Sequence, residues 1–181
     1  MKYRTACNLT EMVKTAILVF GANGIIEDFS IVPRLLRDSL IVETWEGPHN
    51  TLCLQIMRDA HRFNFWQMLQ KEISGYLDAW PKNQATLARA LYEQSFKSLM
   101  NQMSEINSPQ AIAIHAKRVV DHAACLIEAG CYVGLLQKQG NQEEGFKLVT
   151  HYLEKSLNAQ CGNYELSLAK WGTEEILKVL G

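Results

Sequence analysis

The sequence has little proline, no long uninterrupted apolar run and almost no net charge. Four of its 181 residues are proline, and the formal net charge is −1 with a pI near 6.5. A near-neutral chain has no global field that would attract nucleic acid or an anionic membrane surface, so we expect neither as a partner. No apolar run approaches the length that crosses a bilayer. These absences favour an ordinary soluble globular protein.

The sequence also lacks a disulfide pattern, although it contains five cysteines. Their number is odd and they are widely spaced among apolar residues, which is typical of reduced thiols rather than of a secreted disulfide framework. No basic and apolar leader opens the chain. We therefore expect a cytoplasmic protein. The cysteines are Cys7, Cys53, Cys125, Cys131 and Cys161.

What the sequence does contain is helical periodicity. Apolar residues recur at helical spacing along nearly the whole chain, and only the short run at 39–45 (SLIVETW) could be extended. Asn8 or Thr10 can cap the first helix and Gly21 can end it, while Asn50 and Ser108 are placed to cap later helices. We expect helices at about 8–20, 31–39, 50–76, 84–106, 109–139, 142–159 and 162–180, with irregular structure at 40–50.

The predicted elements indicate an all-α chain in two parts. The front unit spans residues 1–78, and a back unit spans residues 79–181. Short connections between the later helices favour antiparallel neighbours, so the back unit is expected to be an up-and-down four-helix bundle. The break near Pro81 is the predicted domain boundary.

Four short motifs follow one another in the front unit. A helix ends at a glycine turn (GANG, 21–24), an acidic pair (ED, 27–28) and a short helix with LLRD (35–38) follow, and a WEGP loop (45–48) opens the next helix. In this order and spacing, residues 20–60 resemble the C-terminal helical domain of flavin-dependent acyl-CoA dehydrogenases. The loop tryptophan and the long helical tail are similar to the alkylation-response branch. The resemblance implies a helical bundle of the acyl-CoA dehydrogenase C-terminal-domain type with an additional C-terminal helical bundle.

The same resemblance implies roles for individual residues. Glu46 falls on the carboxylate that, in many members, removes the α-proton of an acyl-CoA while hydride passes to the flavin; such a base needs a pKa raised by a dry pocket. The glycine turn falls on the segment that approaches FAD from a neighbouring subunit, and the residues after Glu46 fall beside the same cofactor. The implied FAD-binding residues are Gly21, Ala22, Gly24, Gly47, Pro48 and Asn50.

The chain departs from the family pattern at three contact positions. Leu18 replaces a polar cofactor contact, Ala22 replaces a glycine, and Pro48 replaces a threonine and so lacks both a hydroxyl and an N–H. The upstream helical and β domains that form the flavin and acyl-CoA sites are not among these residues. We therefore expect the isolated chain to be inactive and to need those domains, on a separate or upstream chain, as partners. The alternative is a helical oligomerisation or binding module without catalytic activity.

Other chemistry has less support in the sequence. His115, His122, Cys125 and Cys131 share one long apolar helix without a paired short motif such as Cys-x-x-Cys, so we interpret them as core or partly buried side chains and expect no metal site. Ser95 has no acid or base pattern nearby that would activate it.

The front helices are expected to drive self-association. Their apolar face is too large for a monomer surface, which favours a symmetric homodimer whose interface excludes residues 162–180. Arg37 and Asp38 are expected to form a structural ion pair that fixes the loop, rather than to contact a ligand. The apolar residues of the face are Leu9, Val13, Ile17, Phe20, Leu52, Ile56 and Phe63.

Overall fold

The computed structural model describes residues 2–80, 86–106, 108–139 and 142–161. Within these ranges every regular element is helical and no strand occurs, which confirms the all-α prediction. The chain forms two compact units, residues 1–56 and 57–181. The predicted boundary at 78–79 lies at the end of a helix inside the second unit, and the division into domains stays a prediction about independent folding.

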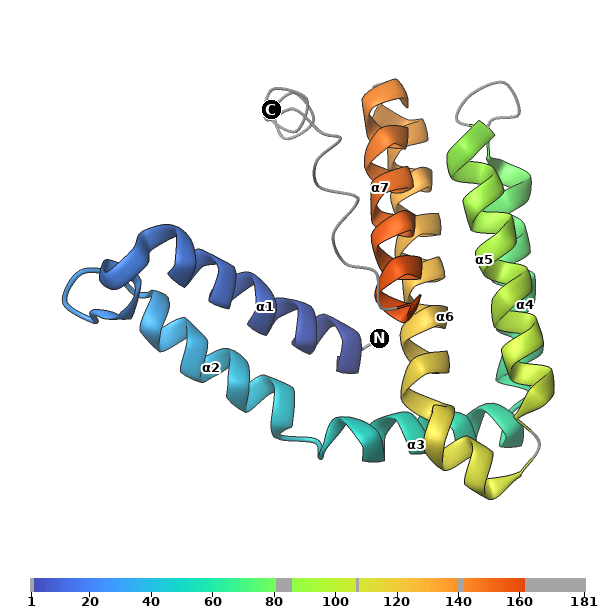
Figure 1. Ribbon diagram of the computed structural model, residues 1–181, viewed down its shortest axis with the longest axis horizontal. Coiled ribbons are helices and arrows are strands. Elements are labelled where there is room, and N and C mark those ends of the chain that lie inside the picture. Colours follow the sequence, from blue (N-terminus) through green and yellow to red (C-terminus); the bar gives the residue numbers. More distant parts are fainter. Residues whose placement is uncertain (1, 81–85, 107, 140–141, 162–181) are drawn as a thin grey trace. The chain divides into compact units, whose positions relative to one another are not determined.

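The first unit is a helical hairpin. Helix α1 (Lys2–Phe20) leads into a 3₁₀ helix η1 (Gly21–Ile25), and α2 (Val32–Thr44) returns along α1. Figure 1 shows α1 and α2 side by side and antiparallel, with η1 and the following turn at one end. Helix α1 ends directly before Gly21, as predicted, and the chain reverses after it.

Helix α1 begins six residues before the predicted start at residue 8. The buried residues Tyr3, Ala6, Thr10 and Val13 form one stripe at helical spacing, and this stripe already includes the first turn. Asn8 and Thr10 are therefore interior residues, and the prediction of a cap at either one is wrong. The Thr10 hydroxyl donates a hydrogen bond of 3.3 Å to the Ala6 carbonyl one turn earlier, which satisfies this buried polar group.

Helix α2 is longer than predicted and includes much of the segment expected to be irregular. Pro33 lies in its first turn, where the missing N–H costs no helical hydrogen bond. Residues 40–44 continue the helix, so neither the irregular nor the extended interpretation of the 39–45 run holds. No turn-forming residue interrupts this run before Gly47, and the Thr44 hydroxyl donates a hydrogen bond of 2.8 Å to the Leu40 carbonyl.

The predicted long helix at 50–76 is two helices. Helix α3 (His49–Arg62) and α4 (Phe65–Ala79) are separated at Asn64, whose φ of 52° is left-handed. Asparagine tolerates this conformation better than most residues. Since α3 begins at His49, Asn50 lies in its first turn rather than at the predicted cap; the Pro48 carbonyl accepts the Leu52 N–H at 3.1 Å.

The second unit is a four-helix arrangement of α4, α5 (Thr86–Glu105), α6 (Pro109–Gln139) and α7 (Gln142–Cys161). Helix α6 packs against α4, α5 and α7, and α5 also packs against α7 (Figure 1). The bundle thus uses α4, whereas the predicted helix at 162–180 lies outside the described residues. The predicted cap of α6 is confirmed, because the Ala111 N–H donates to Ser108 Oγ at 3.1 Å.

Aromatic side chains form the core of the bundle. The ring centroid of Trp80 lies 5.3 Å from that of Tyr92 and 5.9 Å from that of Phe146, and all three residues are buried. The Tyr92 hydroxyl donates to the Leu126 carbonyl at 2.9 Å. Helix α6 is long and apolar enough to cross a membrane, but 61% of its apolar window is buried, a pattern shared by core helices of soluble proteins.

Candidate functional site

The glycine turn at 21–24 requires glycine at two positions. Gly21 has a φ of +60°, a backbone conformation that residues with a side chain rarely adopt. A Cβ on Gly24 would lie 2.6 Å from the carbonyl oxygen of Ile17, so the close approach of η1 to α1 excludes any side chain there. Ala22, which stands where the family has a glycine, is exposed and is not crowded by the fold. Gly21 and Ala22 are exposed in this turn, whereas Gly24 is buried.

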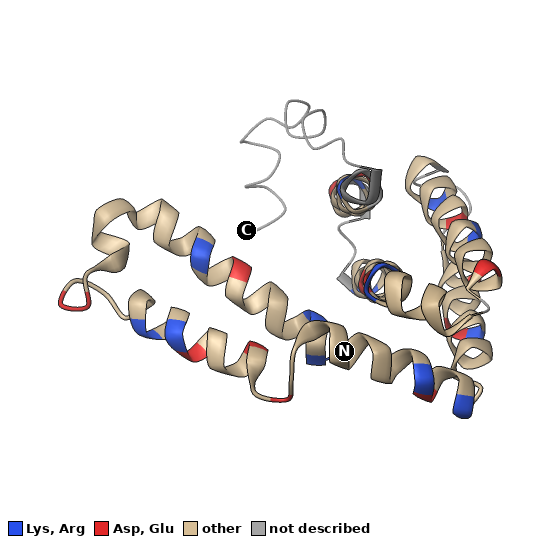
Figure 2. Ribbon diagram, turned by 60° about the horizontal axis from the view of Figure 1, so that its bottom comes forward, with Lys and Arg blue, Asp and Glu red and all other residues tan. Residues whose placement is uncertain are grey.

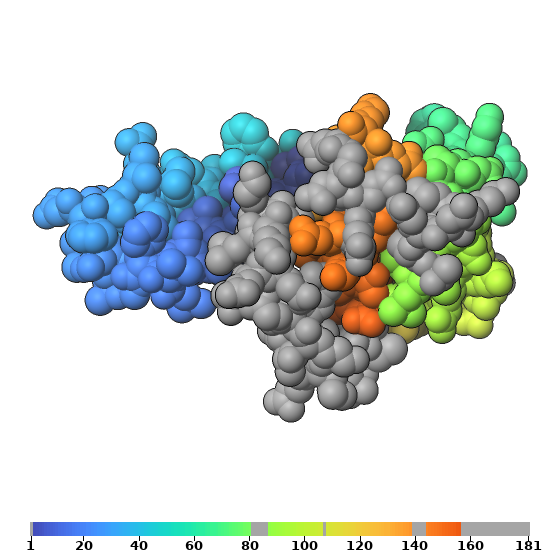
Figure 3. All heavy atoms as spheres, turned by 90° about the horizontal axis from the view of Figure 1, so that it is seen from above, coloured from blue at the N-terminus to red at the C-terminus, as the bar shows by residue number. Residues whose placement is uncertain are grey.

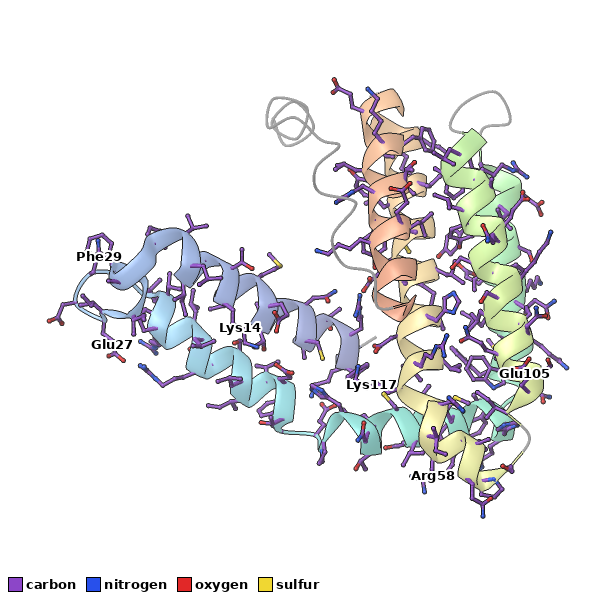
Figure 4. The ribbon with its side chains drawn as sticks, in the orientation of Figure 1. Lys14, Glu27, Phe29, Arg58, Glu105 and Lys117 are labelled. Atoms are coloured by element: carbon purple, nitrogen blue, oxygen red, sulfur yellow. The ribbon has the colours of Figure 1, made fainter. Side chains whose placement is uncertain are left out.

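An ion pair connects α2 to the turn between η1 and α2. Arg37 Nη2 lies 2.5 Å from Glu27 Oε1, while Asp38 lies 3.9 Å from Arg34 on its own helix. The predicted pairing of Arg37 with Asp38 is therefore wrong, because adjacent helical residues point in different directions. Figure 4 shows Glu27 at the tip of the hairpin. The pair is exposed, so it orients the turn more than it stabilises the fold.

The Glu46 loop lies between α2 and α3. Glu46 Oε2 is 3.5 Å from Lys2 Nζ, and the glutamate side chain is 54% exposed. Gly47 has a φ of +117°, and its N–H donates to the Thr44 carbonyl at 3.0 Å. Pro48 and Asn50 are exposed beside it. A general base of raised pKa needs a dry environment, and this chain leaves Glu46 in solvent.

The structure does not bring the two groups of predicted FAD-binding residues together. The glycine turn follows the C-terminal end of α1, whereas Glu46 is paired with Lys2 at the N-terminal end of that helix. A helix of 19 residues is about 28 Å long. The turn residues and the loop residues are therefore at opposite ends of the hairpin.

Close to Glu46, the structure assembles three ligand-type side chains that the sequence interpretation missed. Cys7 from α1, Glu43 from α2 and His49 at the start of α3 place their ligand atoms within 4.8 Å of one another. His49 Nε2 lies 3.6 Å from Cys7 Sγ and 3.0 Å from Glu43 Oε1. The Tyr3 ring packs edge-on against the His49 ring, with the two ring centroids 5.0 Å apart. No short motif links the three residues, so only the fold reveals the cluster.

A second polar group lies in the core of the bundle. Ser95 Oγ lies 2.8 Å from His122 Nε2, and His122 Nδ1 lies 3.5 Å from Gln102 Oε1. Ser95 therefore does have a histidine partner, contrary to the sequence interpretation. Both side chains are buried, and burial lowers the pKa of His122 to about 4, helped by the nearby Arg118 charge and opposed by the hydrogen bond to Ser95. With no solvent access, the pair acts in packing rather than in catalysis.

The two histidines and two cysteines of α6 do not place their ligand atoms together. His122 is taken up by Ser95, Cys125 is buried, and Cys131 Sγ lies 3.4 Å from the Tyr76 hydroxyl. His115 is exposed elsewhere on the helix. Among the residues that the structure describes, these four form no group of ligand atoms.

A groove lies between α6 and α7 in the described part of the bundle. Its volume is about 420 Å³ and its lining is mostly apolar. Glu128 and Tyr152 supply polar groups there, and the tyrosine hydroxyl donates a hydrogen bond to the carboxylate. This groove contains none of the predicted site residues.

Comparison with known proteins bears on the first unit. A family model described as acyl-CoA dehydrogenase, C-terminal domain, matches residues 1–61. No curated protein and no solved structure matches the chain. The matched segment contains α1, η1, α2 and nearly all of α3, including the glycine turn and the Glu46 loop, and the alkylation-response branch stays a prediction. The resemblance is thus confirmed for this third of the chain, 61 of 181 residues, which is related to the C-terminal domain of acyl-CoA dehydrogenases.

Proposed function

We propose that this chain supplies the C-terminal helical part of a flavin-dependent oxidoreductase that α,β-dehydrogenates acyl-CoA thioesters, and that it is inactive alone. The observation that supports this proposal is the arrangement of the hairpin, which carries a small-residue turn at one end and an exposed carboxylate at the other. Gly21, Ala22 and Glu46 are exposed, and within the described residues no walls of a binding site surround either feature. Flavin-binding and acyl-CoA-binding domains from elsewhere would provide those walls.

In the proposed assembly Glu46 is the base. Docking of a partner domain over the loop would exclude water from the carboxylate and make it a better acceptor for the α-proton. Gly47 and Pro48 would line the FAD beside it, while Gly21, Ala22 and Gly24 would approach the adenine dinucleotide portion. FAD supplies the hydride-accepting ring when it is bound.

The hairpin geometry favours two copies per working unit. Because the turn and the loop are separated by the length of α1, about 28 Å, one copy cannot place both against the same part of one flavin. A two-fold axis would bring the turn of one copy toward the loop of its partner. We therefore propose a homodimer in which each cofactor is contacted by both chains.

The surface of the hairpin is suited to such association. No charged residue occurs between Lys14 and Glu27, which Figure 2 shows as an unbroken tan stretch over the end of α1 and η1. Leu18 and Val19 are about 80% exposed there. Figure 3 shows this end of the hairpin, in blue, at the surface of the unit. Burying this surface is favourable by about 25 cal/mol per Å² of apolar area.

The alternative proposal is a binding or oligomerisation module that has kept the helical scaffold without the chemistry. Leu18 and Pro48 favour it, since neither can donate a side-chain hydrogen bond to a cofactor. Ala22 favours it because its methyl group hinders the close backbone approach that glycine allows. In that case the apolar hairpin surface alone would carry the function. We propose a cytoplasmic location for either form.

Spectroscopy and activity measurements on the full chain test the proposal. We expect purified protein mixed with FAD to retain no flavin after gel filtration, and to reduce no electron-acceptor dye when an acyl-CoA is added. Flavin retention with dye reduction by the chain alone would contradict the need for partner domains. If a flavin domain encoded upstream is co-expressed, turnover that depends on this chain supports the oxidoreductase, whereas stable association without turnover supports the module.

A further inference from the structure

We propose that Cys7, Glu43 and His49 form a zinc-binding site that holds the hairpin and the start of α3 together. The proposal is independent of the acyl-CoA dehydrogenase function. It rests on three side chains from three different helices whose ligand atoms converge at one point.

The distances between the ligand atoms suit a tetrahedral ion. Zinc bonds of about 2.3 Å to sulfur and 2.0–2.1 Å to nitrogen place neighbouring S and N ligands about 3.5 Å apart. Cys7 Sγ and His49 Nε2 are separated by 3.6 Å. Glu43 Oε1 and His49 Nε2, at 3.0 Å, need to separate only slightly to admit the ion.

The direction of the contacts also points to a cation. One ring nitrogen, Nε2 of His49, faces both the Cys7 sulfur and the Glu43 carboxylate. A ring nitrogen carries either one hydrogen or one lone pair in the ring plane, so it cannot satisfy both neighbours along a single axis. An ion placed between the three atoms satisfies all of them.

Charge and access agree with this interpretation. A thiolate, a carboxylate and a neutral imidazole carry two negative charges, which a divalent ion neutralises. This mixed set of soft and borderline ligands is typical of zinc. All three residues are half-buried, so an ion can enter from solvent and a water molecule can complete the coordination. The Tyr3 ring against His49 fixes the orientation of the imidazole.

Titration of the full metal-free chain with Zn²⁺ and Co²⁺ tests the site. We expect one equivalent of zinc to bind and to raise the melting temperature, and cobalt to show a thiolate-to-metal charge-transfer band. Cys7→Ser, Glu43→Gln and His49→Gln should each weaken zinc binding at least tenfold, and Cys7→Ser should remove the band. Cys131→Ser and His61→Gln change exposed ligand-type residues elsewhere and should bind as the unmodified chain does.

Two results would overturn the proposal. One is an unmodified chain that takes up no equivalent of zinc or gives no charge-transfer band. The other is binding that persists unchanged in Cys7→Ser and His49→Gln. The first does not depend on whether a variant folds, and circular dichroism of each variant separates lost binding from lost helix.

Discussion

Acid should destabilise the four-helix bundle through His122. Burial lowers the pKa of this side chain from its ordinary value of 6.5 to about 4, so the folded state binds fewer protons than the unfolded chain between these values. The contribution to stability is therefore fully present above about pH 6.5. It is lost as the pH falls toward 4 and changes no further well below that.

The size of the effect follows from the same two values. A shift of one pKa unit corresponds to about 1.4 kcal/mol. For pKa values of 6.5 and about 4, the His122 contribution to the free energy of unfolding falls by about 3 kcal/mol between pH 7 and pH 4. This is a large part of the stability of a typical domain.

Urea denaturation followed by far-ultraviolet circular dichroism measures this loss. Carboxylates titrate in the same window, so the comparison is between variants: His122→Gln should lose about 3 kcal/mol less than the unmodified chain between pH 7 and pH 4. His115→Gln, which changes an exposed histidine on the same helix, should lose as much as the unmodified chain. Equal losses of unfolding free energy in His122→Gln and the unmodified chain would refute the reasoning. They would mean that His122 binds its proton as readily in the folded state as in the unfolded chain.

Further predictions concern the hairpin. Gly24→Ala should lower the free energy of unfolding by about 1–3 kcal/mol, because the new Cβ would lie 2.6 Å from the Ile17 carbonyl; Gly75→Ala, at an open helical position, should raise it by about 0.5–1 kcal/mol in the same denaturation assay. In a flavin-containing assembly, Glu46→Gln should abolish dye reduction while leaving the flavin absorbance unchanged, since the amide keeps the shape but accepts no proton. Turnover in that variant would remove Glu46 from the mechanism. Leu18→Ser should weaken self-association in sedimentation while changing chain stability by no more than about 0.5 kcal/mol, because this side chain is 80% exposed.

Those parts of the fold that depend on local signals could be predicted from the sequence. Ser108 before a proline predicts the start of α6, and Gly21 predicts the end of α1. The break at Asn64 could not be predicted, because no glycine or proline marks it and apolar spacing continues across it. The true start of α1 was missed because its first turn has no strong cap and is fixed by burial of Tyr3 and Ala6.

The candidate site also contains features that the sequence could predict and features that it could not. The order of the motifs identifies the segments that contain the glycine turn and Glu46, and the family match over residues 1–61 covers both segments. The roles of these residues at a cofactor stay predictions. The cluster of Cys7, Glu43 and His49 could not be predicted, since its members become neighbours only when α2 folds back along α1. The partner of Ser95 was missed for the same reason, because His122 is 27 residues away.

We propose that two copies of the chain associate through their hairpins, and the mass of the full chain in solution tests this dimer most directly. Size-exclusion chromatography with light scattering at micromolar concentration should give about 41 kDa, twice the chain mass of 20.5 kDa. Leu18→Ser should shift the mass toward the monomer if the exposed end of α1 lies in the interface. A monomer of about 20.5 kDa across the concentration range would contradict the claim and would mean that the apolar hairpin surface is covered within one chain.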